Sequence, residues 1–159
     1  MHHNQQIYKQ PISVLVIIHD EQYRILLLER ADKPDFWQSV TGSRENCDQS
    51  LLETAIREVH EETGIVANLN QLKDWQYCSQ YEIFPHWRYR YAPDVTHNTE
   101  HVFSLCIPAD SQIMLAPSEH LNYGWYELTA AADKVFSPSN RSAILNLPQY
   151  LSLSTLSIE

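Results

Sequence analysis

The sequence contains one stretch that decides both its fold and its chemistry, Arg57-Glu58-Val59-His60-Glu61-Glu62-Thr63-Gly64-Ile65. At about 100° per residue, Glu58, Glu61 and Glu62 lie on one face of an α-helix. Like charges at this spacing repel, and the helix dipole disfavours carboxylates in the last turns. A divalent cation removes both penalties, because carboxylate oxygens are the ligands that Mg²⁺ and Mn²⁺ prefer. The pattern therefore indicates either a metal site or a solvated acidic face.

Residues around this stretch mark both ends of the helix. Ser50 and Glu53 form the S-x-x-E pattern of a capping box, in which each side chain bonds a free backbone N–H. Apolar residues then repeat at the spacing of one buried stripe, at Leu52, Ala55, Ile56 and Val59. Gly64 follows where the end of a helix favours a left-handed residue. We predict a helix over residues 51–63.

Apolar and β-branched runs predict the strands. They cover residues 11–19, 23–29, 36–41, 65–69, 75–84 and 101–107. The first two strands form a hairpin around the polar turn at 20–22, and the third ends at Gly42. A closing helix is predicted over 139–151, with Ser139 or Asn140 as its N-cap. The irregular alternation of strands and helices predicts an α+β domain with a mixed sheet.

The composition limits the classes of protein to which this chain can belong. The chain has 159 residues and is 43% hydrophobic, which is enough for one domain over residues 1–159. It carries 20 Asp and Glu against 11 Lys and Arg, a formal net charge of −9. A general nucleic-acid binder needs cationic patches, so this charge argues against that class. An acidic protein binds a polyanion only through a few placed cations or through a metal.

The same sequence argues against a membrane protein and a disulfide scaffold. The longest apolar run, 14–18, is far shorter than a membrane span of about 20 residues, and the N-terminus shows no secretory pattern. Cys47, Cys78 and Cys106 are far apart and form no CxxC pair. We therefore expect reduced thiols and a cytoplasmic protein.

The quoted stretch, together with Gly42, closely resembles the Nudix box, G-x5-E-x7-R-E-U-x-E-E-x-G-U with U aliphatic. The half from Arg57 to Ile65 matches at every defined position. The first half departs from the pattern, and the simplest account is one extra residue between Gly42 and Ser50. We predict that Asp48 replaces the missing glutamate as the partner of Arg57.

Segments outside the box resemble one bacterial Nudix subfamily, which hydrolyses dihydroneopterin triphosphate. They are Tyr8–Pro11, Asp35–Gly42, Glu82–Phe84, Arg88–Pro93, Asn98–Glu100 and Ser118–Leu121. The resemblance implies an α/β/α sandwich with a mixed sheet. It also implies Mg²⁺-dependent hydrolysis, with Mn²⁺ as a substitute, to dihydroneopterin monophosphate and pyrophosphate, a step towards folate.

The resemblance also implies roles for the acidic residues. Glu58 and Glu62 would hold the metal, with Glu61 as a further ligand or as a group behind the ligands. Glu119 matches a carboxylate that the subfamily brings in from a distant loop. Glu58 and Glu119 are both candidates for the base that activates water, and Glu61 belongs to the same catalytic set.

The implied substrate contacts fall into two groups. Lys9, Arg30, Thr41 and Ser137 occupy subfamily positions that meet the phosphates or the ring. The run Tyr81, Glu82, Ile83 and Phe84 would line a planar pocket, in which an aromatic stacks on the pterin and a carboxylate accepts its N–H groups. From the residues alone, a strand-end arginine is also typical of a solvent-facing charge, and an aromatic strand is typical of a core.

Other aromatic and imidazole residues receive plainer interpretations. His86, His97, His101 and His120 show no zinc spacing, so we read them as surface or loop residues. Trp75, Tyr77, Trp87, Tyr89 and Tyr91 lack a basic stripe, so core packing or a dimer contact is favoured over stacking on RNA.

Two other functions stay open from sequence. One is a Nudix nucleoside triphosphate pyrophosphohydrolase that removes dATP or oxidised dGTP, because purines share the fused-ring edge of pterins. The other is a non-catalytic Nudix ligand sensor, although a sensor has no need of the repulsive acidic cluster. We expect a small-molecule triphosphate as the partner, with no nucleic acid and no membrane. The sequence favours no particular oligomeric state.

Overall fold

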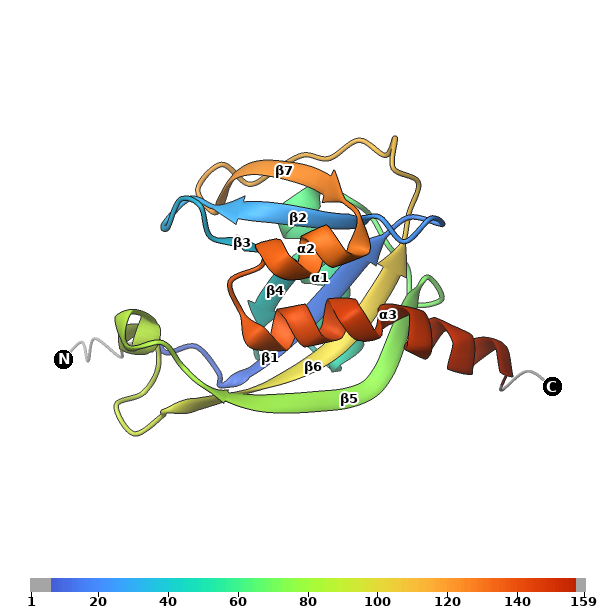
Figure 1. Cartoon of the computed structure of the whole chain (residues 1–159). Coiled ribbons are helices and arrows are strands. Elements are labelled where there is room, and N and C mark those ends of the chain that lie inside the picture. Colours follow the sequence, from blue (N-terminus) through green and yellow to red (C-terminus); the bar gives the residue numbers. More distant parts are fainter. Residues whose placement is uncertain (1–6, 157–159) are drawn as a thin grey trace.

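A mixed β-sheet lies between helices in the computed structural model, which describes residues 7–156 and the side chains of 7–152 (Figure 1). The strands are β1 (Ile12–His19), β2 (Ile25–Arg30), β3 (Trp37–Gln38), β4 (Val40–Ser43), β5 (Leu72–Glu82), β6 (His97–Cys106) and β7 (His120–Tyr126). The helices are α1 (Leu51–Thr63), the 3₁₀ helix η1 (Pro85–Arg90), α2 (Leu128–Lys134) and α3 (Pro138–Leu156). Parts of the predicted domain at 1–6 and 157–159 lie outside the described residues.

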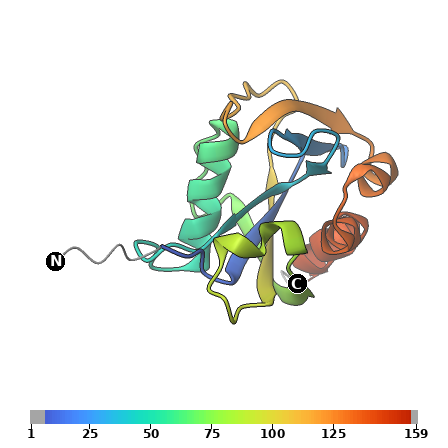
Figure 2. The same cartoon turned by 90° about the vertical axis from the view of Figure 1, so that its left-hand side faces the viewer.

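The sheet runs in the order β3-β2-β1-β6-β5, while β4 pairs with β1 and β7 pairs with β2. β1 and β6 are parallel, with Leu15 opposite Val102, and the other pairings are antiparallel. Figure 2 shows α1 on one side of the sheet and α3 on the other. The predicted α+β class, with a mixed sheet in a sandwich of helices, is therefore confirmed.

Alternate residues of β1 build the cores on the two faces of the sheet. Val14 and Val16 pack with Val59 of α1, whereas Leu15 and Ile17 pack with the α2 and α3 side. Successive side chains of a strand point to opposite faces, so a strand covered on both faces is apolar at nearly every position. This requirement explains the continuous apolar run that the sequence shows at 14–18.

Helix α1 has the predicted bounds. Ser50 Oγ accepts the backbone N–H of Glu53 at 3.2 Å, and the N–H of Gly64, at φ +76°, donates to His60 at 2.9 Å. The second half of the capping box differs from the prediction, because the Glu53 carboxylate accepts the backbone N–H of Gln49 instead of that of Ser50.

Three other predictions about secondary structure need correction, and three elements were not predicted. The predicted strand at 36–41 is two strands, because the chain changes partner from β2 to β1 at Ser39. The predicted strand at 65–69 is a loop, from which Ala67 packs into the core. Helix α3 begins at Pro138, with Ser137 Oγ accepting the N–H of Asn140 at 3.4 Å. η1, β7 and α2 were not predicted.

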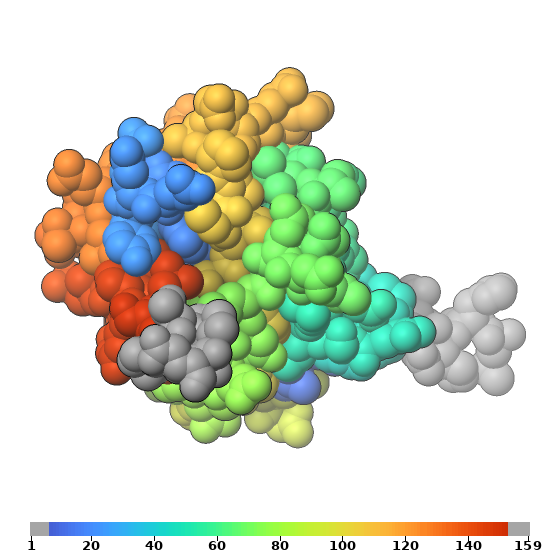
Figure 3. Space-filling model, turned by 90° about the vertical axis from the view of Figure 1, so that its right-hand side faces the viewer, coloured from blue at the N-terminus to red at the C-terminus, as the bar shows by residue number. Residues whose placement is uncertain are grey.

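The long helix α3 packs against the bend of β5. The Trp75 indole stacks on the Tyr150 ring, with their centroids 4.2 Å apart, and Lys73 Nζ donates to the Tyr150 carbonyl. Figure 3 shows this face, with red atoms of α3 beside green atoms of the β5 region. Trp75 is buried, which agrees with its interpretation as a core residue. Within residues 7–156, every helix is too short or too polar to cross a bilayer.

Candidate active site

The acidic face of α1 is divided between the interior and solvent. Glu62 is 1% exposed, Glu58 is buried, and Glu61 is exposed. Burial raises the pKa of Glu58 to about 7. Burial, with the neighbouring carboxylates of Glu58 and Glu119, raises the pKa of Glu62 well above its usual value. Two buried carboxyl groups that share a site keep a proton to a higher pH than exposed ones, and a bound cation can take the place of that proton.

The first residue of β7, His120, and the residue before the strand, Glu119, are two further ligand candidates beside Glu62. The β2–β7 ladder places His120 opposite Arg30, and the Ala31 N–H donates to the Glu119 carbonyl at 2.9 Å. Ligand atoms of Glu62, Glu119 and His120 all lie within 4.8 Å of one another. This spacing fits a single metal ion.

His120 corrects the interpretation of the histidines as surface or loop residues. It is 4% exposed, and its Nε2 atom lies 3.4 Å from Glu62 Oε1. Burial and the nearby charge of Arg30 lower the pKa of His120 to about 4, so the imidazole is neutral and can act as a ligand. Its position next to Glu119 was the one signal in the sequence that could have drawn attention to it.

The residues present fit a divalent cation. Glu62 Oε2 and His120 Nδ1 are buried and have no hydrogen-bond partner among the described residues. Buried polar atoms are normally paired, so each of these atoms is available to a ligand. A set rich in carboxylate oxygens is typical of hard cations such as Mg²⁺ or Mn²⁺.

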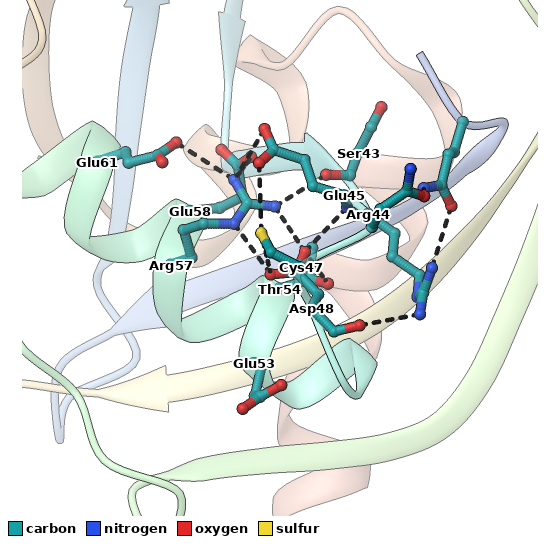
Figure 4. A network of polar contacts seen from close by, with 12 residues as sticks. Ser43, Arg44, Glu45, Cys47, Asp48, Glu53, Thr54, Arg57, Glu58 and Glu61 are labelled. Atoms are coloured by element: carbon teal, nitrogen blue, oxygen red, sulfur yellow. Dashed lines mark hydrogen bonds and ion pairs between the residues drawn. The ribbon is translucent and has the colours of Figure 1, made fainter. Parts of the chain in front are cut away.

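Arg57 ties the acidic helix to the loop before it (Figure 4). Its Nη2 atom donates to Asp48 Oδ2 at 2.8 Å and to the Ser43 carbonyl at 3.1 Å, while Nη1 donates to Glu58 Oε1 at 2.9 Å and to Glu61 Oε2 at 3.4 Å. Asp48 is therefore the partner of Arg57, as predicted. The bonds to this guanidinium hold the pKa of Asp48 well below its usual range.

The acidic cluster opens into a cavity of about 970 Å³, which is large enough for a nucleotide-sized ligand. Each of the twelve residues that the sequence analysis assigns to the site lines this cavity. They are Lys9, Arg30, Thr41, Glu58, Glu61, Glu62, Tyr81, Glu82, Ile83, Phe84, Glu119 and Ser137. The fold thus brings the whole predicted set together, from segments up to 128 positions apart in the chain (137 − 9).

The NUDIX domain model matches residues 9–147. The chain belongs to the Nudix family. It is 48% identical over 142 residues to dihydroneopterin triphosphate diphosphatase of Escherichia coli K12, covering 87% of this chain and 93% of the relative. The protein of that name from Haemophilus influenzae is 44% identical, over 86% of this chain and 87% of its own.

Solved structures agree with this assignment. The structure of the E. coli dihydroneopterin triphosphate pyrophosphohydrolase matches with a TM-score of 0.80 at 48% identity, covering 87% of this chain and 94% of that one. A Nudix hydrolase structure from Listeria monocytogenes matches with a TM-score of 0.74 at 21% identity and supports the fold alone. Nudix hydrolases generally use divalent metal ions, which agrees with the acidic cluster of this chain.

Arg30 lies between the acidic cluster and the aromatic part of the cavity. Its guanidinium makes two bonds to Asp32, at 2.7 and 2.8 Å, and one to Gln38 at 3.0 Å. It also stacks over the Trp87 ring, with Cζ 4.4 Å from the centroid. Three neighbours, Asp32, Gln38 and Trp87, therefore hold this cation in place beside the cavity.

Aromatic rings form one wall of the cavity. Trp87 lies 5.5 Å from Phe84 and 5.7 Å from Phe136, measured between ring centroids. Trp87 is half-buried and lines the cavity with Phe136, a position that its interpretation as a core or dimer residue did not include. The place of these two rings in the cavity wall was not predicted, because Trp87 lies in the 3₁₀ helix η1 and Phe136 lies in the turn after α2, neither of which has a clear sequence pattern.

The other predicted substrate residues make local contacts as well as lining the cavity. Thr41 Oγ1 donates to the Val14 carbonyl at 3.0 Å, and the Thr41 backbone N–H bonds the Glu62 carboxylate. Ser137 is the N-cap of α3. The Glu82 carboxylate accepts a bond from Arg88 Nη2.

Proposed function

We propose that this chain hydrolyses dihydroneopterin triphosphate to dihydroneopterin monophosphate and pyrophosphate, with Mg²⁺ as the cofactor. The two relatives named above carry this activity in their names, at 48% and 44% identity over most of both chains. The observation that carries the proposal is the cavity, in which carboxylates, cationic side chains and an aromatic wall lie together. A fused-ring triphosphate needs all three.

The acidic residues would hold the metal. We assign Glu58, Glu62 and Glu119 as ligands, with Glu61 as a further ligand or an outer group. His120 supplies a neutral nitrogen beside Glu62 and Glu119. When bound, Mg²⁺ neutralises charge on the phosphate oxygens and favours in-line attack by water.

Other residues of this chain would position the substrate and move a proton. Lys9 and Arg30 bind the triphosphate, because guanidinium and ammonium groups form charge-assisted bonds to phosphate oxygens. Glu58 or Glu119 accepts the proton of the attacking water.

The net charge of −9 fits this mechanism. A chain with few cations does not capture a polyanion by bulk electrostatic attraction. Binding through a metal held by some of its own carboxylates removes this difficulty. Substrate affinity is therefore expected to collapse when the divalent metal is chelated.

The test compares kcat/KM for dihydroneopterin triphosphate, dATP and 8-oxo-dGTP, with pyrophosphate release as the measured product. A higher value for either nucleotide would reject the proposal in favour of the nucleoside triphosphatase. An absence of turnover for all three would favour the ligand sensor. Hydrolysis in H₂¹⁸O then locates the attacked phosphorus, because the label appears either in the monophosphate or in pyrophosphate.

A further inference from the structure

A second polar cluster lines the same cavity, on the opposite face of the sheet from α1. Asn98 and Glu100 of β6 share a face with Val102, which packs in the core below α2 and α3. Glu58 and Glu62 come from α1, which packs on the other face. The cavity is therefore lined from both faces of the sheet, by the acidic residues of α1 on one and by Asn98 and Glu100 on the other.

Glu100 is a buried carboxylate with few hydrogen-bond donors around it. It is 4% exposed, and Ser139 Oγ donates to its Oε1 at 2.9 Å. Within residues 7–152, this is the one side-chain hydrogen bond to that carboxylate. Burial raises the pKa of Glu100 to about 7. A carboxylate kept in such a position costs free energy unless a ligand supplies donors.

Asn98 beside it has an unsatisfied amide atom. The side chain is 1% exposed, and Nδ2 donates to Ser13 Oγ at 2.7 Å and to the Tyr81 hydroxyl at 3.1 Å. Asn98 Oδ1 is buried without a partner among the described residues. Because hydroxyls both donate and accept, the amide can rotate and present an N–H to the cavity instead.

We propose that Glu100 and Asn98 form the subsite that recognises the 2-amino-4-oxo edge of the pterin. This edge presents two parallel N–H donors, on ring N3 and on the 2-amino group, followed by a carbonyl oxygen. A carboxylate matches two parallel donors, and the adjacent amide pairs with the carbonyl. The inference rests on the proposed function and names the residues that select the ring.

The position of Glu100 suits this role better than that of Glu82, the carboxylate that the sequence analysis assigned to the ring. The Glu82 side chain is 66% exposed and forms an ion pair with Arg88. A hydrogen bond at a solvent-exposed side chain adds little selectivity, because water can replace it. A buried acceptor that the wrong ring leaves unpaired lowers the affinity for that ring.

The first experiment measures steady-state kinetics of Glu100→Gln with dihydroneopterin triphosphate and Mg²⁺. The amide keeps the shape of the side chain but replaces one acceptor with a donor. We expect KM to rise about 10- to 100-fold, as for the loss of a hydrogen bond to a charged group, while kcat changes much less. Glu21→Gln is the matched control, because Glu21 is exposed in the β1–β2 turn outside the cavity, and its KM should stay unchanged.

A second readout separates ring recognition from a structural role in holding α3 through Ser139. Guanine presents the same amino and N–H edge as a pterin, and hypoxanthine lacks the amino group. We expect the wild-type protein to favour dGTP over dITP in kcat/KM by about tenfold, and Glu100→Gln to reduce this ratio towards one. Ser139→Ala, which removes the contact to α3 but keeps the carboxylate, should preserve the ratio.

The outcomes distinguish this inference from the proposed function. If the wild type hydrolyses dihydroneopterin triphosphate and Glu100→Gln keeps both its KM and its dGTP-to-dITP ratio, the inference is overturned and the function stands. If the wild type does not turn over dihydroneopterin triphosphate, the function itself fails. Should the variant not fold, equal wild-type turnover of dGTP and dITP would overturn the inference.

Discussion

The backbone of Gly42 lies directly against the carboxyl group of Glu58. A Cβ atom at position 42 would lie 2.0 Å from Glu58 Cδ and 2.3 and 2.4 Å from its two carboxylate oxygens. A side chain at position 42 would therefore have to displace the Glu58 carboxyl group, whereas the backbone dihedral angles of Gly42 do not demand glycine. The absence of a side chain on β4 thus lets the carboxylate from α1 keep its place beside the cavity.

Gly42→Ala is expected to displace the Glu58 carboxylate and lower kcat at least about 100-fold, because a shift of about 1 Å at a reacting group has effects of that size. Pyrophosphate release measures this loss, and circular dichroism checks the fold. The double variant with Glu58→Gln should lose no more activity than Glu58→Gln alone, since both changes act on one group. Independent, multiplied losses would contradict the proposed cause.

Glu62→Gln is expected to abolish Mg²⁺-dependent pyrophosphate release while the protein stays folded. Glu62 is 1% exposed and has an unpaired oxygen, so its carboxylate is suited to bind metal and contributes little to stability without it. Thermal unfolding with and without Mg²⁺ provides the second measurement. Wild-type Tm should rise with Mg²⁺ as expected for a ligand of the native state, and the variant should not respond. Unchanged activity would reject the metal assignment.

Mg²⁺ affinity is expected to rise with pH through about pH 7. In the metal-free protein, burial raises the pKa of Glu58 to about 7, so below that pH the cation must displace a proton. Titration calorimetry in two buffers with different ionisation enthalpies measures the protons released. Equal affinity at about pH 6 and about pH 8, without proton release, would contradict the shared carboxylate site.

The stability of the metal-free protein should change with pH in the opposite direction. The folded state holds a proton on Glu58 that the unfolded chain, with a glutamate pKa of about 4.3, has already released. This contribution is fully present below about pH 4.3 and is lost as the pH rises through about 7. Denaturant midpoints measured across this pH range for the wild type and for Glu58→Gln isolate the contribution of Glu58 to stability.

Asp48→Asn is expected to lower the free energy of unfolding by about 1–3 kcal/mol at neutral pH. Asp48 is buried and accepts bonds from Arg57 and from Thr54 Oγ1, the latter at 2.8 Å. Its pKa is held well below the usual range, so its stabilisation is present above about pH 3.9 and is lost as the pH falls below that value. Urea denaturation measures both effects.

The matched control for Asp48 is Asp133→Asn. Asp133 also pairs with an arginine, Arg141 at 3.0 Å, but its side chain is 73% exposed. Exposed ion pairs contribute between about 0 and 1 kcal/mol, so the control should leave the denaturation midpoint nearly unchanged. An equal loss in both variants would mean that burial of the Asp48–Arg57 pair is not the cause.

Arg30→Lys is expected to raise KM for the triphosphate about tenfold or more, although the charge is kept. Arg30 stacks over Trp87 and bonds Asp32 through two guanidinium nitrogens, and lysine reproduces neither geometry. Arg141→Lys on the exposed face of α3 is the control. A normal KM in Arg30→Lys would show that the position supplies charge alone.

Much of the fold could be predicted from local signals. Helix α1 has its predicted bounds because Ser50 and Gly64 act on the backbone groups next to them. Strand β1 was predicted because burial on both faces demands a continuous apolar run. The strand at 36–41 was mispredicted because only the tertiary structure separates the partners of β3 and β4. β7 exposes Leu121, Asn122 and Tyr123 in succession, so its residues show no alternation of apolar and polar side chains that would predict a strand.

Residues close together in the chain were enough to predict the family, the acidic helix face and the compensation of the extra loop residue by Asp48. The burial of Glu58 and Glu62, the approach of His120 to Glu62, and the position of Glu100 on the opposite face of the sheet come from long-range packing. The physical reason is that desolvation and convergence depend on neighbours from distant segments. The pairing of β2 with β7 and the packing of α3 on β6 supply those neighbours, and no local pattern specifies them.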